Sequence, residues 1–293
     1  MELWLLLAVL TGTFFGLQSI LLKILSGYFS QTVILKNLFL IAGILLLPAI
    51  FFGQIEFRPL PFFITFLISL TLNIVAYSLL LEAISNYPIS IVMPFVGLTP
   101  LFLTFTSYLI LDERLTKLKI LGIILIVMGA FILQLPENWR PKNWRTAFNW
   151  REKGIWLMVL VAFIWSITAS VEKIAVRSSS PEFYGATIHL ALGAAFVILE
   201  KWFRKKKNEK TLISTQGSGK KILILLLGLI SASLAWCQLV AIKITYVSYV
   251  IAFKRAGIIV STLLAFFVLK ERNYVKAISG TVLIIVGATL ITL

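Results

Sequence analysis

The segment LDERLTKLKILGIILIVMGA, residues 111–130, decides the fold because its pattern returns near the end of the chain. The second copy is LKERNYVKAISGTVLIIVGA, residues 269–288. An ungapped alignment superposes an acid and two glycines: Glu113 on Glu271, Gly122 on Gly280, and Gly129 on Gly287. Such self-similarity predicts that the chain consists of two homologous halves.

The alignment continues upstream without a gap, through Ser90 on Ser248, to Ala83 on Ala241. The first helices of the two halves match more loosely, with Lys23 against Lys173. We therefore divide the chain into a first repeat (1–136), a polar linker (137–154) and a second repeat (155–293).

The composition predicts an integral membrane protein. Hydrophobic residues make up 59% of the chain, charged residues only 13%, and the mean hydropathy is +0.98. A soluble domain carries roughly a quarter charged residues. Leu, Ile and Val dominate, which favours helices over the alternating pattern of a membrane barrel. The net charge of +15 does not indicate nucleic-acid binding, since most cations fall in short inter-helix loops.

About 20 apolar residues are needed to cross the hydrocarbon layer as a helix. Ten segments qualify, near 3–25, 33–52, 61–84, 88–111, 119–135, 155–173, 183–200, 221–243, 247–269 and 277–293. Five helices per half is an odd number, so the second half must enter the membrane the other way up. The expected fold is an all-α integral membrane protein with ten transmembrane helices in two inverted five-helix repeats, a construction common among secondary transporters.

The sequence resembles the drug/metabolite transporter superfamily, and within it the EamA-type transporters. The resemblance covers nearly the whole chain and depends on LDER (111–114), LKER (269–272) and the two glycines that follow each. It implies alternating-access transport of small organic solutes and leaves the solute undefined.

Several residues are candidates for structural or gating roles. Gly122 and Gly129 share one helix face, as do Gly280 and Gly287, and small residues let membrane helices approach closely. Glu113 and Glu271 stand where a helix ends, and we expect each to cap the helix that follows, with proton coupling as the alternative.

Pro94 and Pro100 interrupt the fourth predicted helix, where the aligned positions of the ninth hold Ala252 and Ile258. Proline removes a backbone donor and kinks a helix. We expect a kinked helix beside the substrate path, or only a local packing adjustment.

Lys254 and Arg255 lie side by side within the apolar ninth segment. A cation at the bilayer centre costs roughly 2.5–3.5 kcal/mol. Adjacent helical residues point about 100° apart, so snorkelling cannot serve both. His189 is expected at a similar depth, with Glu172 as the nearest internal counter-charge. We interpret the cluster as an anion-binding site, against the alternative of a structural ion pair or of snorkelling to the membrane surface.

The resemblance adds that related organophosphate translocators carry a Lys-Arg pair in this late helix and use it on anionic substrates. Only Lys254 and Arg255 match, so phosphate specificity does not follow.

A second polar group is expected near the opposite membrane face, where Lys23, Lys36 and Glu82 could pair and gate. Further candidates to line the path by hydrogen bonding are Asn73, Tyr77 and Gln18. The alternative is that these side chains bridge neighbouring helices.

The sequence thus predicts a secondary transporter for a small, anionic organic metabolite, in the cell membrane. The alternative is an exporter of neutral or zwitterionic solutes such as amino acids or drugs. One histidine and one cysteine provide no metal or nucleophile–base set, so we expect no enzyme, catalytic residue, metal or cofactor. The expected partners are the solute and the lipid bilayer, with a homodimer left open and no nucleic acid.

The orientation has two conflicting indications. Cations concentrate on the side that carries loops 136–154 and 201–221, and the positive-inside rule places that side in the cytoplasm and both termini outside. The family resemblance implies termini inside.

Overall fold

The computed structural model describes residues 2–52, 57–87, 92–134, 152–207, 218–260 and 274–293, and its regular structure there is entirely helical. The helices are α1 (Leu3–Ser26), α2 (Gln31–Leu46) with the 3-10 helix η1 (Leu47–Phe52), α3 (Pro59–Asn86), the 3-10 helix η2 (Met93–Leu98), α5 (Thr99–Leu111), α6 (Lys117–Gln134), α8 (Lys153–Arg177), α9 (Pro181–Lys207), α10 (Ser218–Ile244), α11 (Val247–Ala256) and α13 (Tyr274–Thr292).

Seven helices of the described residues are long and apolar enough to cross a membrane. They span Leu3–Ser26, Gln31–Phe51, Pro59–Ile84, Pro94–Leu111, Lys153–Arg177, Pro181–Lys201 and Lys221–Ile244. Large apolar side chains remain exposed along them, such as Leu67 at 58% and Ile198 at 69%. Lipid rather than water is the solvent that such surfaces require.

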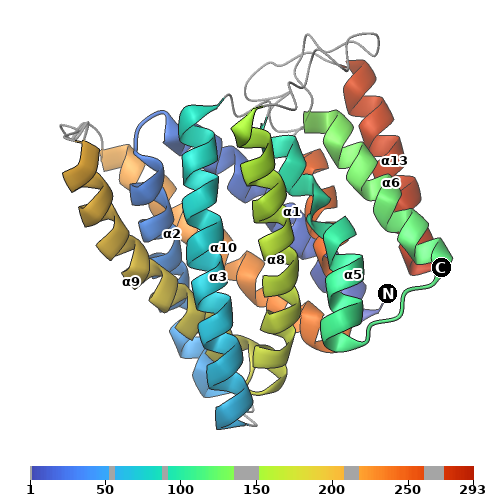
Figure 1. Cartoon of the computed structure of the whole chain (residues 1–293), viewed down its shortest axis with the longest axis horizontal. Helices are drawn as coiled ribbons and strands as arrows, with labels where there is room; N and C mark the ends of the chain where they lie inside the picture. The colour runs from blue at the N-terminus through green and yellow to red at the C-terminus, as the bar shows by residue number, and fades with distance from the viewer. Residues whose placement is uncertain (1, 53–56, 88–91, 135–151, 208–217, 261–273) are drawn as a thin grey trace.

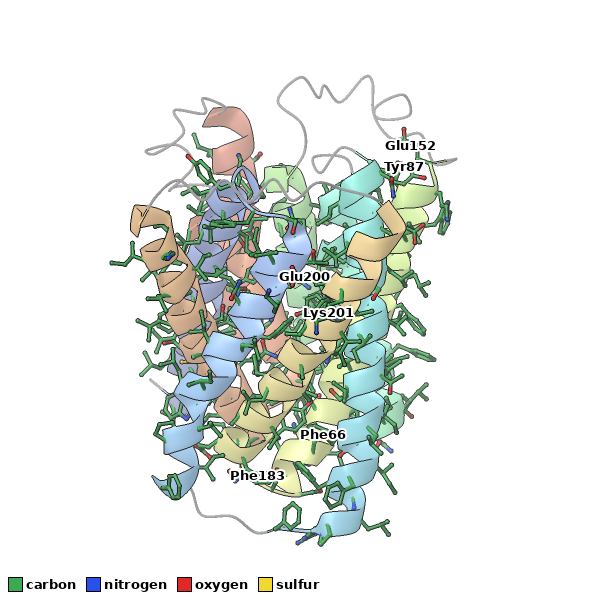
Figure 2. All side chains as sticks on the ribbon, turned by 90° about the vertical axis from the view of Figure 1, so that its left-hand side faces the viewer. Phe66, Tyr87, Glu152, Phe183, Glu200 and Lys201 are labelled. Atoms are coloured by element: carbon green, nitrogen blue, oxygen red, sulfur yellow. The ribbon has the colours of Figure 1, made fainter. Side chains whose placement is uncertain are left out.

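Consecutive helices run up and down the bundle. Figure 2 shows Tyr87, after α3, and Glu152, before α8, at one end, whereas Phe66 and Phe183 lie towards the other. The two chain termini lie close together (Figure 1).

Helices α6 and α13 pack tightly through the glycines of the repeated motif (Figure 1). A Cβ added to Gly122 would lie 2.6 Å from the carbonyl oxygen of Gly287, and one added to Gly129 would lie 2.5 Å from that of Gly280. The early glycine of α6 therefore meets the late glycine of α13, and the two helices run antiparallel.

Other helix pairs follow the same correspondence between halves. The third helix of the first half, α3, packs on the first helix of the second half, α8, and α1 packs on α10 in the reciprocal way. The second helices, α2 and α9, pack on each other.

The fourth predicted helix is interrupted. Residues 93–98 form the 3-10 helix η2, and α5 begins at Thr99, with Pro94 and Pro100 each in the first turn of its element. Proline lacks the N–H that a continuous α-helix requires and is tolerated in a first turn.

The ninth predicted helix is interrupted at the aligned place, although no proline is there. Helix α11 ends at Ala256, Gly257 forms a turn, and helix resumes at 258–260. In the repeat alignment Gly257 falls on Thr99. The two halves therefore share a break that sequence analysis expected only where proline occurs.

Candidate functional site

Lys254 and Arg255 occupy the last turn of α11. A helix C-terminus carries partial negative charge and favours cations. Arg255 is 9% exposed and Lys254 is half-buried. Each side chain hydrogen-bonds to another helix, so both point into the bundle rather than at lipid.

Arg255 reaches the break in the fourth helix. Its Nη2 donates to Thr99 Oγ1 at 3.1 Å, and Thr99 Oγ1 donates to the Val96 carbonyl at 2.7 Å. The Arg255 Nε is buried and has no hydrogen-bond partner within the described structure. A guanidinium with an unused donor is prepared to bind one more acceptor.

Lys254 donates from Nζ to Gln238 Oε1 on α10 at 2.8 Å. The Phe15 ring of α1 lies next to both cations, 5.6 Å from Lys254 Nζ and 5.3 Å from Arg255 Cζ. These distances are within the range of cation–π attraction. The two cations are thus held mainly by uncharged groups.

Among the described residues, no carboxylate lies within 4.0 Å of either cation. The carboxylate of Glu172 on α8 makes no such direct contact but interacts electrostatically with Lys254. Its Oε1 accepts a hydrogen bond from Asn73 Nδ2 at 3.4 Å, and the hydroxyls of Ser69 and Tyr184 also contact it. Ser69 and Tyr184 share a hydrogen bond of 2.7 Å.

Tyr77 links this carboxylate with the cations. It is half-buried and interacts electrostatically with both Glu172 and Arg255. Its ring packs edge-on against Phe39 at 5.1 Å and Trp165 at 5.3 Å. The packed rings of Tyr77, Phe39 and Trp165 therefore lie next to the charged groups.

His189 and Gln18 also lie within the bundle. His189 donates from Nδ1 to the Gly185 carbonyl at 2.7 Å, lies 5.8 Å from the Phe39 ring and interacts electrostatically with Lys254. Gln18 donates to Ser231 Oγ at 2.8 Å and so bridges α1 and α10.

The ion-pair partners of Lys36 and Glu82 differ from those that the sequence predicted. Lys36 pairs with Glu200 at 2.7 Å, and Figure 2 shows Glu200 on α9, close to α2. Glu82 pairs with Lys153 at 3.1 Å on the surface. Within the expected group of Lys23, Lys36 and Glu82, Lys36 and Glu82 therefore do not pair with each other, because Lys36 pairs with Glu200 of the second repeat and Glu82 with Lys153 of the linker.

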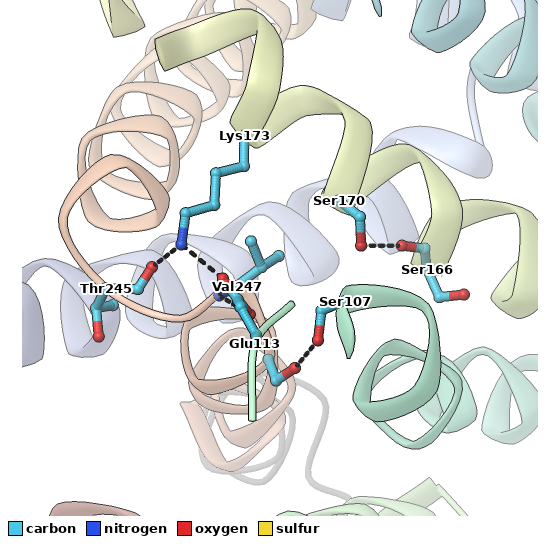
Figure 3. Close-up of polar contacts among 8 residues, drawn as sticks. Ser107, Glu113, Ser166, Ser170, Lys173, Thr245 and Val247 are labelled. Atoms are coloured by element: carbon cyan, nitrogen blue, oxygen red, sulfur yellow. Dashed lines mark hydrogen bonds and ion pairs between the residues drawn. The ribbon is translucent and has the colours of Figure 1, made fainter. Parts of the chain in front are cut away.

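A second charged cluster joins α8 to the residues around the start of α11 (Figure 3). Lys173 Nζ donates to Glu113 Oε1 and to the Thr245 carbonyl, both at 2.6 Å. Glu113 also accepts the Val247 N–H at 3.1 and 3.2 Å. Both side chains are buried, at 2% and 4% exposure.

Glu113 therefore caps α11, not α6 as expected from its place in the chain. The cap satisfies one of the free N–H groups at the start of α11, that of Val247, and places a carboxylate at the positive helix end. A pocket of about 490 Å³ adjoins the cluster. The aligned Glu271 lies outside the described residues.

Sequence analysis missed five uncharged contributors: Phe15, Ser69, Thr99, Tyr184 and Gln238. Polar residues within apolar segments are the available signal for Ser69, Thr99, Tyr184 and Gln238. Nothing in the sequence distinguishes Phe15 from the many other phenylalanines.

Comparison with known proteins gives three results. The model of the EamA-like transporter family matches residues 2–135 and 152–293. No curated protein sequence matches the chain. A solved structure described only as "Crystal structure of protein" has 18% identity and a TM-score of 0.77, covering 97% of this chain and 96% of that one. This similarity shows a shared fold.

Proposed function

Because the chain belongs to the EamA-like transporter family, we propose that it is a secondary transporter that moves a small organic anion by alternating access between two inverted repeats. The chain is a multi-pass integral membrane protein of a transporter family. The anionic substrate and the mechanism are the proposal.

The antiparallel pairing of α6 and α13 supports the inverted repeats. These helices carry the two copies of the repeated motif, so opposite directions in space mean opposite directions of the two halves in the membrane. The family match to 2–135 and 152–293 supports halves at 1–136 and 155–293, joined by 137–154. Five membrane-spanning helices in each half, ten in all, are part of the proposal.

The observation that carries the anionic substrate is the neutral surroundings of two cations within the bundle, Arg255 buried and Lys254 half-buried. Arg255 and Lys254 bond to a hydroxyl and an amide, and Arg255 keeps one donor unused. Charged groups within membrane segments are costly and usually functional. Arg binds carboxylate or phosphate with two parallel hydrogen bonds, and Lys adds a point charge.

The broken helices support a central binding site. In secondary transporters, interrupted helices commonly form the substrate site near the bilayer midplane. Here the last turn of α11 meets the first turn of α5, and Arg255 and Thr99 join across the two breaks.

The alternative is a zwitterionic solute, and Glu172 favours it. A carboxylate beside Lys254 could hold an ammonium group while the cations hold an acid group. Neutral solutes have no such support, since they leave both cations without a counter-charge.

The experiment is counterflow of labelled solutes in proteoliposomes. We expect wild-type protein to exchange at least one of lactate, succinate and glycerol phosphate, and alanine not at all. In Lys254→Ala/Arg255→Ala, anion exchange should fall at least tenfold, because charge-assisted hydrogen bonds contribute about 1.5–3 kcal/mol each.

The matched control is Lys221→Ala/Lys243→Ala, which removes two exposed cations at the ends of α10. It should exchange like wild type. Exchange of alanine alone, or anion exchange that survives loss of both cations, would contradict the anionic substrate.

A further inference from the structure

Glu172 has surroundings unlike those of the buried acid at the end of the bundle. Glu113 has a lysine ammonium at 2.6 Å and two contacts to one backbone N–H. Glu172 has an amide at 3.4 Å and two hydroxyls, while Lys254, the cation that interacts with it electrostatically, bonds to Gln238 instead. A partly buried carboxylate without a direct counter-charge is costly unless it can take up a proton.

The neighbours of Glu172 suit both of its protonation states. Serine and tyrosine hydroxyls donate to a carboxylate and, after rotation, accept from a carboxylic acid. Ser69 and Tyr184, which bond to each other at 2.7 Å, are such groups. When Glu172 is protonated, each hydrogen-bonding atom of this cluster therefore still has a partner.

We propose that Glu172 binds a proton together with the anion held by Lys254 and Arg255, so that this protein is an anion–proton symporter. The inference rests on the proposed function and adds its coupling ion. The carboxylate on α8 gains the proton and becomes a neutral acid, and release of the anion returns the proton to solution.

The sign of the coupling follows from charge. Without substrate, the positive field of Lys254 stabilises the ionised carboxylate. A bound anion cancels that field and adds negative charge nearby, so the protonated carboxyl becomes the favoured form. Linkage is reciprocal, hence a proton on Glu172 strengthens anion binding by the same factor.

Other charged or titratable groups near the site are few. Tyr77 on α3 and Tyr184 on α9 face Glu172, and Lys254 faces it from α11. Arg255 and His189 act from further away, through Tyr77 and Lys254 respectively. Helix α10 contributes the uncharged Gln238. Within the described residues, Glu172 is the acid of this cluster.

The test measures proton movement and exchange on the same proteoliposomes. With succinate as the probe, or the panel anion that exchanges fastest, wild-type vesicles holding a pH dye should acidify as the anion enters. When the solution outside the vesicles is more acidic than the solution inside, the anion should accumulate to at least five times the level reached without a proton gradient.

In Glu172→Gln, the gradient should no longer drive accumulation. Glu182→Gln, which alters an acid at the start of α9 that bonds to Trp236, is the control and should keep the gradient response. Proton uptake by wild type needs no variant, so the proposal stays testable if Glu172→Gln does not fold.

The outcomes separate the two proposals. Wild-type counterflow without acidification overturns the symport and leaves the anion transporter in place. Proton-coupled uptake that persists in Glu172→Gln moves the proton site elsewhere and overturns the assignment to Glu172. Absence of counterflow for every anion overturns the proposed function and the symport with it.

Discussion

Two pairs of charges within the bundle differ in how they are neutralised. Lys173 and Glu113 are buried, touch at 2.6 Å and use backbone groups to complete their bonding. Lys254 and Glu172 are half-buried and interact over a longer range, each with an uncharged partner of its own. The first pair satisfies itself, whereas the second has no direct charge contact, as the proposed binding of an anion and a proton requires.

Replacing Lys173 with methionine should destabilise the protein by about 3–5 kcal/mol, because it leaves the buried Glu113 charge without its partner. Equilibrium unfolding in mixed micelles measures this free energy. Lys153→Met, which breaks an exposed pair with Glu82, should cost at most about 1 kcal/mol.

The double variant Lys173→Met/Glu113→Gln completes the cycle. It should be less destabilised than the sum of the single changes, since the second substitution removes the orphaned charge. Strict additivity would mean that the two side chains do not stabilise each other.

The sequence predicted which charged residues face the protein interior where they stand within an apolar segment, because a charge exposed to lipid there costs free energy. Lys254 and Arg255 interrupt an apolar run, and the requirement that one of them face protein follows from helical geometry. Their partners were not predictable, because Thr99 and Phe15 come from distant elements. Glu113 shows the same limit: sequence neighbours suggested α6, whereas tertiary packing brings α11 to it.

At the scale of elements, the break at Gly257 depends on contact with α1. A Cβ added to Gly257 would lie 1.8 Å from the carbonyl oxygen of Gly12, and one added to Gly12 would lie 2.5 Å from that of Phe253. The two backbones touch without side chains between them. This crossing places Phe15, one turn further along α1, beside Lys254 and Arg255.

Gly257→Ala should therefore separate α1 from α11 and weaken both stability and transport. We expect a loss of stability of at least about 2 kcal/mol, since the clash is with backbone that cannot change rotamer. Gly27→Ala is the control, because its Cβ would meet only the Ile24 carbonyl oxygen at 3.6 Å. Equal stability of both variants, measured by micelle unfolding, would contradict the tight crossing.

The elements themselves were largely predictable because lipid demands long apolar segments. The expected segment 3–25 compares with α1 at Leu3–Ser26, and 61–84 with α3 at Pro59–Asn86. The break after α11 was not, since no proline marks it. It comes from a glycine and a tertiary contact, neither of which has a distinct local signal.

At the scale of the whole molecule, the repeat in the sequence predicts the pairing of helices. Equivalent helices of the two halves pack on each other, as α6 packs on α13 and α2 packs on α9. The same alignment could not identify which contacts would change during the proposed transport cycle, because a sequence repeat carries no information about which contacts belong to a single conformation.

The proposed alternating access requires the Glu113 end of the bundle to open. There Ser107 of α5 and Ser248 of α11 hydrogen-bond at 3.0 Å, next to the Lys173–Glu113 pair. Because Cys237 is the only cysteine, a Cys237→Ala background permits a defined cross-link. Ser107→Cys/Ser248→Cys should form a disulfide that ties α5 to α11.

Oxidised vesicles should lose more than nine-tenths of counterflow and recover it after reduction, because the cross-link holds that end closed. Each single cysteine variant, treated with the same oxidant, controls for loss of the serines. Mass spectrometry gives the fraction cross-linked. Full transport by fully cross-linked protein would mean that α5 and α11 stay together throughout the cycle, and the solute would have to leave by another route.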